Sequence, residues 1–155
     1  MNNNMKKILF VCHGNICRSP MAEAIMKDIC AKSPCHKFEI ASAATSTEEI
    51  GNDIYYEAKR VLLKNKIPFE PRKARQITKA DYNYYDYIVV MDDYNIYNLR
   101  RIIVEDYAHK VYKLNNFIHS DKDVDDPWYT REFDKCFLEI YNGCKAMHEY
   151  ILKDY

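Results

Sequence analysis

An unbroken apolar run that leads directly into a polar loop is the feature that most constrains the fold of this chain. The segment Lys6–Cys12 contains the run ILFV, with no polar residue between. A strand without polar alternation is buried on both faces, as in parallel sheets covered by helices. The loop 12–20 follows, and then a helical segment 20–30, with Ser19 as expected N-cap and Pro20 in its first turn.

The apolar patterns of the remaining chain predict further alternation of strands and helices. We expect strands at 38–42, 87–91 and 110–114, helices at 53–64, 79–84, 95–104 and 131–152, and an irregular segment at 117–129. Thr78 and Asp92 are expected caps of the helices that follow them. Strands alternating with helices indicate an α/β protein with a parallel sheet. The last strand alternates in polarity, which is typical of an edge.

The prediction is therefore one domain over residues 1–155, after a loose tail at 1–5. It is a four-stranded parallel twisted sheet with helices on both faces and a phosphate-binding loop after the first strand. Ligands of such folds bind at the carboxyl ends of the strands. The loop that begins at Cys12 lies at that edge of the sheet.

Charge and apolar content exclude several classes of function. The 23 basic and 23 acidic residues give a formal net charge of zero, so no general electrostatic attraction to nucleic acid is expected. No apolar stretch is long enough for a membrane span or a signal peptide, so we expect a cytoplasmic protein without a membrane partner. Without a secretion signal, we do not expect the six cysteines to form a disulfide framework. Cys30, Cys35, Cys136 and Cys144 are interpreted as structural.

The loop after the first strand has the composition of an oxyanion site. Gly14 and Asn15 tolerate unusual φ angles, and backbone N–H groups of a turn and a helix N-terminus can converge on one anion. Arg18 adds a planar fork that fits two phosphate oxygens. The predicted phosphate-binding residues are His13, Gly14, Asn15, Ile16, Cys17, Arg18 and Ser19. Positive potential there would favour the thiolate of Cys12, to which Ser19 can donate a hydrogen bond.

A thiolate inside a phosphate cradle is a nucleophile for phosphorus, and its leaving group needs a proton. Asp126 is the candidate donor, with Trp128 and Tyr129 as an aromatic wall beside it; Asp125 is interpreted as solvated loop. Two plainer alternatives remain for the cysteine: Cys12 packs in the core, or Cys12, His13 and Cys17 bind zinc.

The loop extends into a longer signature. The sequence VCHGNICRSPMAE at 11–23 closely resembles that of the low-molecular-weight protein tyrosine phosphatases, and the resemblance continues through SAATS at 42–46, KARQ at 73–76, YIVVMD at 87–92 and DP at 126–127. It implies Cys12 as nucleophile, Arg18 as phosphate clamp and Asp126 as general acid and then base, without metal or cofactor. It also implies a supporting network of Asn15, Ser19 and Ser42.

The resemblance also implies ligands and regulation. The expected substrates are phosphotyrosine-containing proteins or peptides, with inorganic phosphate as product and competitive ligand. Cys17 is the implied redox partner, able to form a reversible disulfide with Cys12. A monomer or weak dimer is expected.

Three positions depart from the family pattern. Arg72 stands where many members have a histidine that reaches the loop asparagine, and Arg cannot accept a hydrogen bond. Trp128 replaces a tyrosine. Glu48 stands where some members have tryptophan, so this pocket wall is expected to be more acidic.

Three rival functions share this fold or loop. Arsenate reductases need relay cysteines near the third strand, and residues 81–104 contain none. Phosphoarginine phosphatases carry Thr at the position of Ile16. A phosphate-binding module without activity would not require Cys12, Arg18 and Asp126 together.

Overall fold

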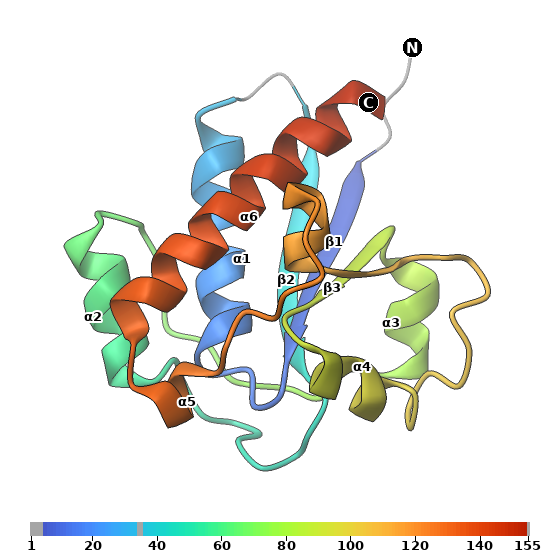
Figure 1. Cartoon of the computed structure of the whole chain (residues 1–155), viewed down its shortest axis with the longest axis horizontal. Coiled ribbons are helices and arrows are strands. Elements are labelled where there is room, and N and C mark those ends of the chain that lie inside the picture. The colour runs from blue at the N-terminus through green and yellow to red at the C-terminus, as the bar shows by residue number, and fades with distance from the viewer. Residues whose placement is uncertain (1–4, 34–35, 155) are drawn as a thin grey trace.

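The computed structural model describes residues 5–33 and 36–154, and its sheet has the predicted parallel architecture (Figure 1). The sheet order is β2-β1-β3-β4, with all neighbours parallel. The strands are β1 (Lys6–Cys12), β2 (Phe38–Ala44), β3 (Tyr87–Val90) and β4 (Val111–Lys113). The helices are α1 (Arg18–Ala31), α2 (Tyr56–Lys64), α3 (Lys79–Tyr84), α4 (Asp93–Leu99), the 3-10 helix η1 (Leu114–Ile118), α5 (Pro127–Thr130) and α6 (Phe133–Asp154). β4 lies at an edge, as predicted.

Successive residues of the central strand β1 point to two separate apolar cores. Ile8 and Phe10 belong to the larger core, which α1, α2 and α6 cover. Leu9 and Val11 belong to the smaller core, which α3 and α4 cover. Both faces of the sheet are thus covered by helices, and this explains why β1 has no polar position between Ile8 and Val11.

The first helix begins earlier than expected, which corrects the prediction that Ser19 is its N-cap. The N-cap is Cys17, whose side chain makes no capping hydrogen bond. The Ser19 hydroxyl lies instead 3.1 Å from the Cys12 sulfur and accepts a hydrogen bond from Asn15. A local capping signal was outweighed by tertiary contacts, so no side-chain cap occupies the start of α1.

Other boundaries differ by a few residues. The helix α2 begins at Tyr56 and not at residue 53, because the Asp53 carboxylate binds the backbone N–H groups of Ile54 and Arg72 and holds a loop. α4 ends at Leu99 and not at 104; turns follow it. Thr78 and Asp92 are both N-caps, as predicted. The segment expected to be irregular contains α5, which Asp126 caps.

Two predictions fall partly on residues outside the described ranges: the loose tail, whose residues 1–4 are not described, and the structural role of Cys35. The other five cysteines are free. Across residues 5–33 and 36–154, no helix has the length and apolar character needed to cross a membrane.

Gly143 allows the long helix α6 to pack closely against η1. A Cβ atom added at Gly143 would lie 2.5 Å from Cγ of Leu114, which is fully buried. We therefore expect Gly143→Ala to lower the free energy of unfolding by about 1–3 kcal/mol, despite the better helix propensity of alanine. Urea denaturation would measure this, with Asn142→Ala at the adjacent exposed position as control. A G143A protein as stable as the parent would contradict the close packing.

Candidate active site

The strand β1 ends at Cys12, at the carboxyl edge of the sheet, and the loop 13–17 leads from there into α1 (Figure 1). Cys12 is 3% exposed, and its sulfur lies inside this loop. It accepts hydrogen bonds from the backbone N–H of Asn15 at 3.3 Å and of Ser19 at 3.4 Å, and the Ser19 hydroxyl is 3.1 Å away. Donors that converge on sulfur stabilise a thiolate.

Asn15 gives the loop its turn. Its φ of 60° places it in the left-handed region, which asparagine tolerates, and it is fully buried. Its side-chain amide donates to the hydroxyls of Ser19 at 2.8 Å and Ser42 at 2.9 Å. The three predicted network residues are therefore joined directly. Gly14 does not have a positive φ; a Cβ there would lie 3.4 Å from Glu49.

Two residues that the prediction left outside this network support it from behind. The Ser42 hydroxyl donates to the Glu23 carboxylate at 2.6 Å. Arg72 donates to the backbone oxygens of Asn15 at 2.6 Å and Asn52 at 3.2 Å. Arginine cannot accept a hydrogen bond at this position, but it reaches the same loop residue as a donor to its main chain.

Arg18 lies at the base of the loop and is 2% exposed. Its guanidinium donates to the Asp92 carboxylate at 2.6 Å and to the backbone oxygen of Val124 at 2.8 Å, and it is 3.4 Å from Asp126. Burial alone would lower the pKa of Arg18, but the negative charges of Cys12, Asp92 and Asp126 raise it above the ordinary value. The arginine is therefore a fixed, permanent positive charge beside the cysteine.

Asp126 has two separate contacts. One carboxylate oxygen accepts the backbone N–H of Trp128 at 3.0 Å and so caps α5, and the other faces Arg18. Trp128 packs edge-on against Tyr55, with ring centroids 4.9 Å apart, and the Arg131 guanidinium lies 5.8 Å from the Trp128 ring. Trp128 and Tyr129 remain exposed at the side of a cavity and do not belong to the core.

This cavity, the reactive pocket, has a volume of about 200 Å³. Its lining residues are Cys12, His13, Gly14, Ile16, Cys17, Arg18, Glu48, Glu49, Asp126, Trp128 and Tyr129. Asn15, Ser19 and Ser42 lie behind the lining. His13 is at the rim, where its ring nitrogen pairs with the carboxylate of Glu48.

Cys17 lies in the same pocket and is 5% exposed. Burial, and then the nearby Cys12, raise the pKa of Cys17 well above its ordinary value, while Arg18 opposes the shift. Cys17 is therefore a neutral thiol. The two cysteines of this loop thus differ: the Cys12 sulfur receives N–H donors, whereas Cys17 is a desolvated thiol.

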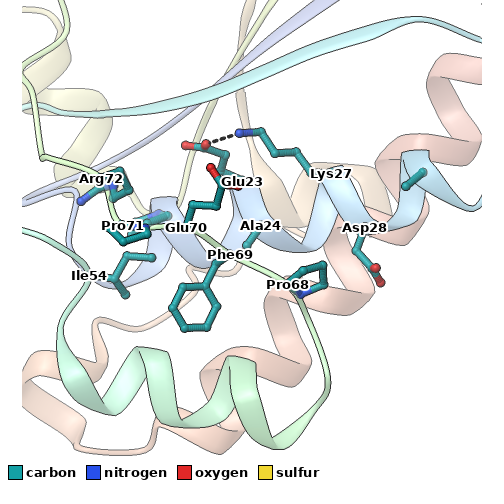
Figure 2. A pocket seen from close by; sticks show the side chains of 12 residues that line it. Glu23, Ala24, Lys27, Asp28, Ile54, Pro68, Phe69, Glu70, Pro71 and Arg72 are labelled. Carbon is teal, nitrogen blue, oxygen red and sulfur yellow. Dashed lines mark hydrogen bonds and ion pairs between the residues drawn. The ribbon is translucent and has the colours of Figure 1, made fainter.

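A second, larger cavity of about 500 Å³ lies between α1 and the segment 68–72 (Figure 2). We call it the α1 groove. Glu23 and Lys27 form an ion pair at 2.6 Å on its α1 side, and Phe69 and Arg72 come from the facing segment. The groove does not include Cys12, Arg18 or Asp126. Two of its lining residues, Glu23 and Arg72, also support the loop of the reactive pocket, through Ser42 and Asn15 respectively.

The zinc alternative finds no support in the described part of the chain. There, no group of three or more His, Cys, Asp or Glu side chains is arranged to hold a metal ion.

A thiol held by N–H donors beside a buried arginine, on the carboxyl edge of a parallel sheet, is typical of a phosphate-binding α/β enzyme. The family model of low molecular weight phosphotyrosine protein phosphatase matches residues 7–155. The chain belongs to this family. Its activity class is accordingly that of a protein-tyrosine-phosphatase, a hydrolase.

Individual relatives are similar over nearly their whole length. The low molecular weight protein-tyrosine-phosphatase YfkJ of Bacillus subtilis is 36% identical over 153 residues, covering 97% of this chain and 98% of the relative. Its crystal structure superposes with a TM-score of 0.93 over 97% of each chain at 37% identity. A Streptococcus pyogenes low molecular weight protein tyrosine phosphatase structure gives 0.84 at 36% identity, covering 94% of this chain and 92% of that one.

A Drosophila arginine phosphatase has the same fold, with a TM-score of 0.83 at 25% identity, over 93% of this chain and 96% of the other.

Proposed function

We propose that this enzyme hydrolyses phosphotyrosine in proteins or peptides through a phosphocysteine intermediate, with Cys12 as nucleophile. The observation that carries the proposal is the Cys12 sulfur itself, which receives N–H donors from the loop and lies beside Arg18. An anionic sulfur and a bound phosphate both need such donors, and one loop provides them for both.

In the first step the Cys12 sulfur attacks phosphorus in line with the tyrosyl oxygen. The S–P bond forms, the P–O bond to tyrosine breaks, and Asp126 gives its proton to the departing oxygen. Loop N–H groups and Arg18 hold the phosphoryl oxygens in the transition state. Asp126 is suited to this role because Asp126 caps α5, which fixes its carboxyl group at the side of the pocket.

In the second step Asp126, now a carboxylate, takes a proton from water. The water oxygen attacks phosphorus and the S–P bond breaks. The Cys12 thiolate is thereby regenerated, and inorganic phosphate is released. Trp128 and Tyr129 are proposed to flank the tyrosyl ring of the substrate. The sum of both steps is phosphotyrosine plus water giving tyrosine plus phosphate.

The experiment that tests this function compares a phosphotyrosine peptide, a simple aryl phosphate and a phosphoarginine peptide, each with a chelator present. We expect turnover of both phosphate esters and at most weak turnover of phosphoarginine. The arginine phosphatase with this fold makes the third substrate the appropriate rival. The branched apolar side chain of Ile16 in the pocket favours an aryl group over a guanidinium. Preferred hydrolysis of phosphoarginine would overturn the proposal.

The position of Cys17 supports a redox role in the same pocket. Peroxide converts the Cys12 thiolate to a sulfenic acid, which Cys17 can attack with loss of water to form a disulfide. We expect peroxide-treated enzyme to regain most of its activity with dithiothreitol, and the Cys17→Ser variant to regain several-fold less, because its sulfenic acid oxidises further. Each protein is normalised to its own untreated activity. Equal recovery would exclude the protective disulfide.

A further inference from the structure

We propose that Glu48 and Glu49 make the reactive pocket select phosphotyrosine that lies next to lysine or arginine in the substrate. This inference rests on the proposed function and adds a substrate class to it. It starts from the loop after β2, which places two consecutive carboxylates in the lining of the pocket.

Both side chains are held in place. Glu49 accepts a hydrogen bond from the Asn52 amide at 2.6 Å, and its Cγ lies 3.4 Å from the position that a Cβ on Gly14 would occupy. Glu48 pairs with His13, whose ring lies 6.0 Å from that of Tyr94, and the Glu48 side chain remains 66% exposed. The carboxylates therefore stand at the mouth, where the residues flanking a bound phosphotyrosine would pass.

The pocket has little positive charge, so the carboxylates of Glu48 and Glu49 affect how an anionic substrate binds. Of the lining residues, Arg18 alone is lysine or arginine, and it lies at the base in contact with Asp92 and Asp126. A dianionic phosphate that binds in the pocket is therefore repelled by Glu48 and Glu49, which line it. A lysine or arginine beside the phosphotyrosine offsets this repulsion, whereas an aspartate or glutamate adds to it.

The aromatic part of the lining differs in chemistry, so the preference depends on position. Trp128 and Tyr129 present aromatic surface, and the nearby cation, Arg131, donates to the Tyr55 hydroxyl at 3.0 Å. A substrate cation therefore gains most on the side of the phosphotyrosine that faces Glu48 and Glu49. On the Arg131 side an acidic residue is tolerated.

The test uses phosphotyrosine peptides that differ only by lysine or glutamate at one of the two positions on either side of the phosphotyrosine. At low ionic strength we expect at least one position to favour lysine about three- to tenfold in kcat/KM, falling toward unity in 0.5 M salt. In the double variant Glu48→Gln, Glu49→Gln this ratio is expected to fall close to one. Because both peptides are measured on the same enzyme, a general change in activity cancels.

Glu149→Gln is the control, because Glu149 is an exposed residue in the C-terminal part of α6 and does not line the reactive pocket. It removes one negative charge, where the double variant removes two, and it is expected to keep the ratio of kcat/KM between the lysine and glutamate peptides. A wild-type ratio near one at all four positions, or a ratio unchanged in the double variant, would overturn the selectivity while aryl phosphate turnover still upholds the proposed function. Absence of aryl phosphate turnover would refute the proposed function itself.

Discussion

The variant Cys12→Ser is expected to lose at least about 10⁴-fold in kcat for aryl phosphate while it still binds inorganic phosphate. A serine hydroxyl is a far weaker nucleophile than a thiolate, but the N–H groups of Asn15 and Ser19 and the guanidinium of Arg18 remain in place. Steady-state kinetics measure the first quantity and isothermal titration with phosphate the second.

The matched control is Cys30→Ser, on α1 and outside the lining of the reactive pocket. Burial raises the pKa of Cys30 to about 11, and because Cys30 does not line the reactive pocket, its loss is expected to leave kcat unchanged. Turnover retained in C12S would contradict the covalent mechanism. Loss of phosphate binding together with turnover would show that the loop had not folded.

The second large effect is expected for Asp126→Asn. Asparagine can still cap α5 through its side-chain oxygen, as Asp126 does at 3.0 Å from the Trp128 N–H, but it cannot donate a carboxylic acid proton. We expect kcat to fall about 10²- to 10⁴-fold for aryl phosphates with poor leaving groups and much less for those with good ones. A series of substituted aryl phosphates measures this as a steeper dependence on leaving-group pKa.

Asp125→Asn provides the control for Asp126, because the neighbouring Asp125 is exposed and does not line the reactive pocket. It should leave both the rate and the leaving-group dependence as they are. An equal loss for all leaving groups in D126N would indicate that Asp126 acts through Arg18 or α5 and not as the proton donor.

Much of the fold could be predicted because its signals are local. The unbroken apolar run in β1 and the alternation of strands and helices indicate a covered parallel sheet, and the structure has one. Ser19 was wrongly predicted as the N-cap of α1 for the same reason, because its spacing from the helix suggested a cap. Its hydroxyl instead contacts Cys12 and Asn15, as the composition of the loop and the family resemblance had predicted.

The residues that hold the candidate site in place through contacts distant in sequence could not be predicted from the sequence. Asp92 was predicted only as a helix cap, yet it also binds Arg18, 74 residues away. Glu23 reaches Ser42, and Arg72 reaches the main chain of Asn15. No periodicity or spacing encodes such pairs, because they depend on the crossing of α1 with neighbouring segments. A charged residue with a buried partner far along the chain can be found only once the fold is known.

The long separation between Arg18 and Val124 also determines when the active site can form during synthesis of the chain. The guanidinium is fixed by a carbonyl 106 residues downstream, and Asp126 follows two residues later. A nascent chain that has exposed only its first hundred residues therefore carries Cys12, Arg18 and its partner Asp92, but neither Val124 nor Asp126. The reactive pocket is therefore complete only after the last fifth of the polypeptide, which brings Val124, Asp126 and Trp128, has been made and has docked.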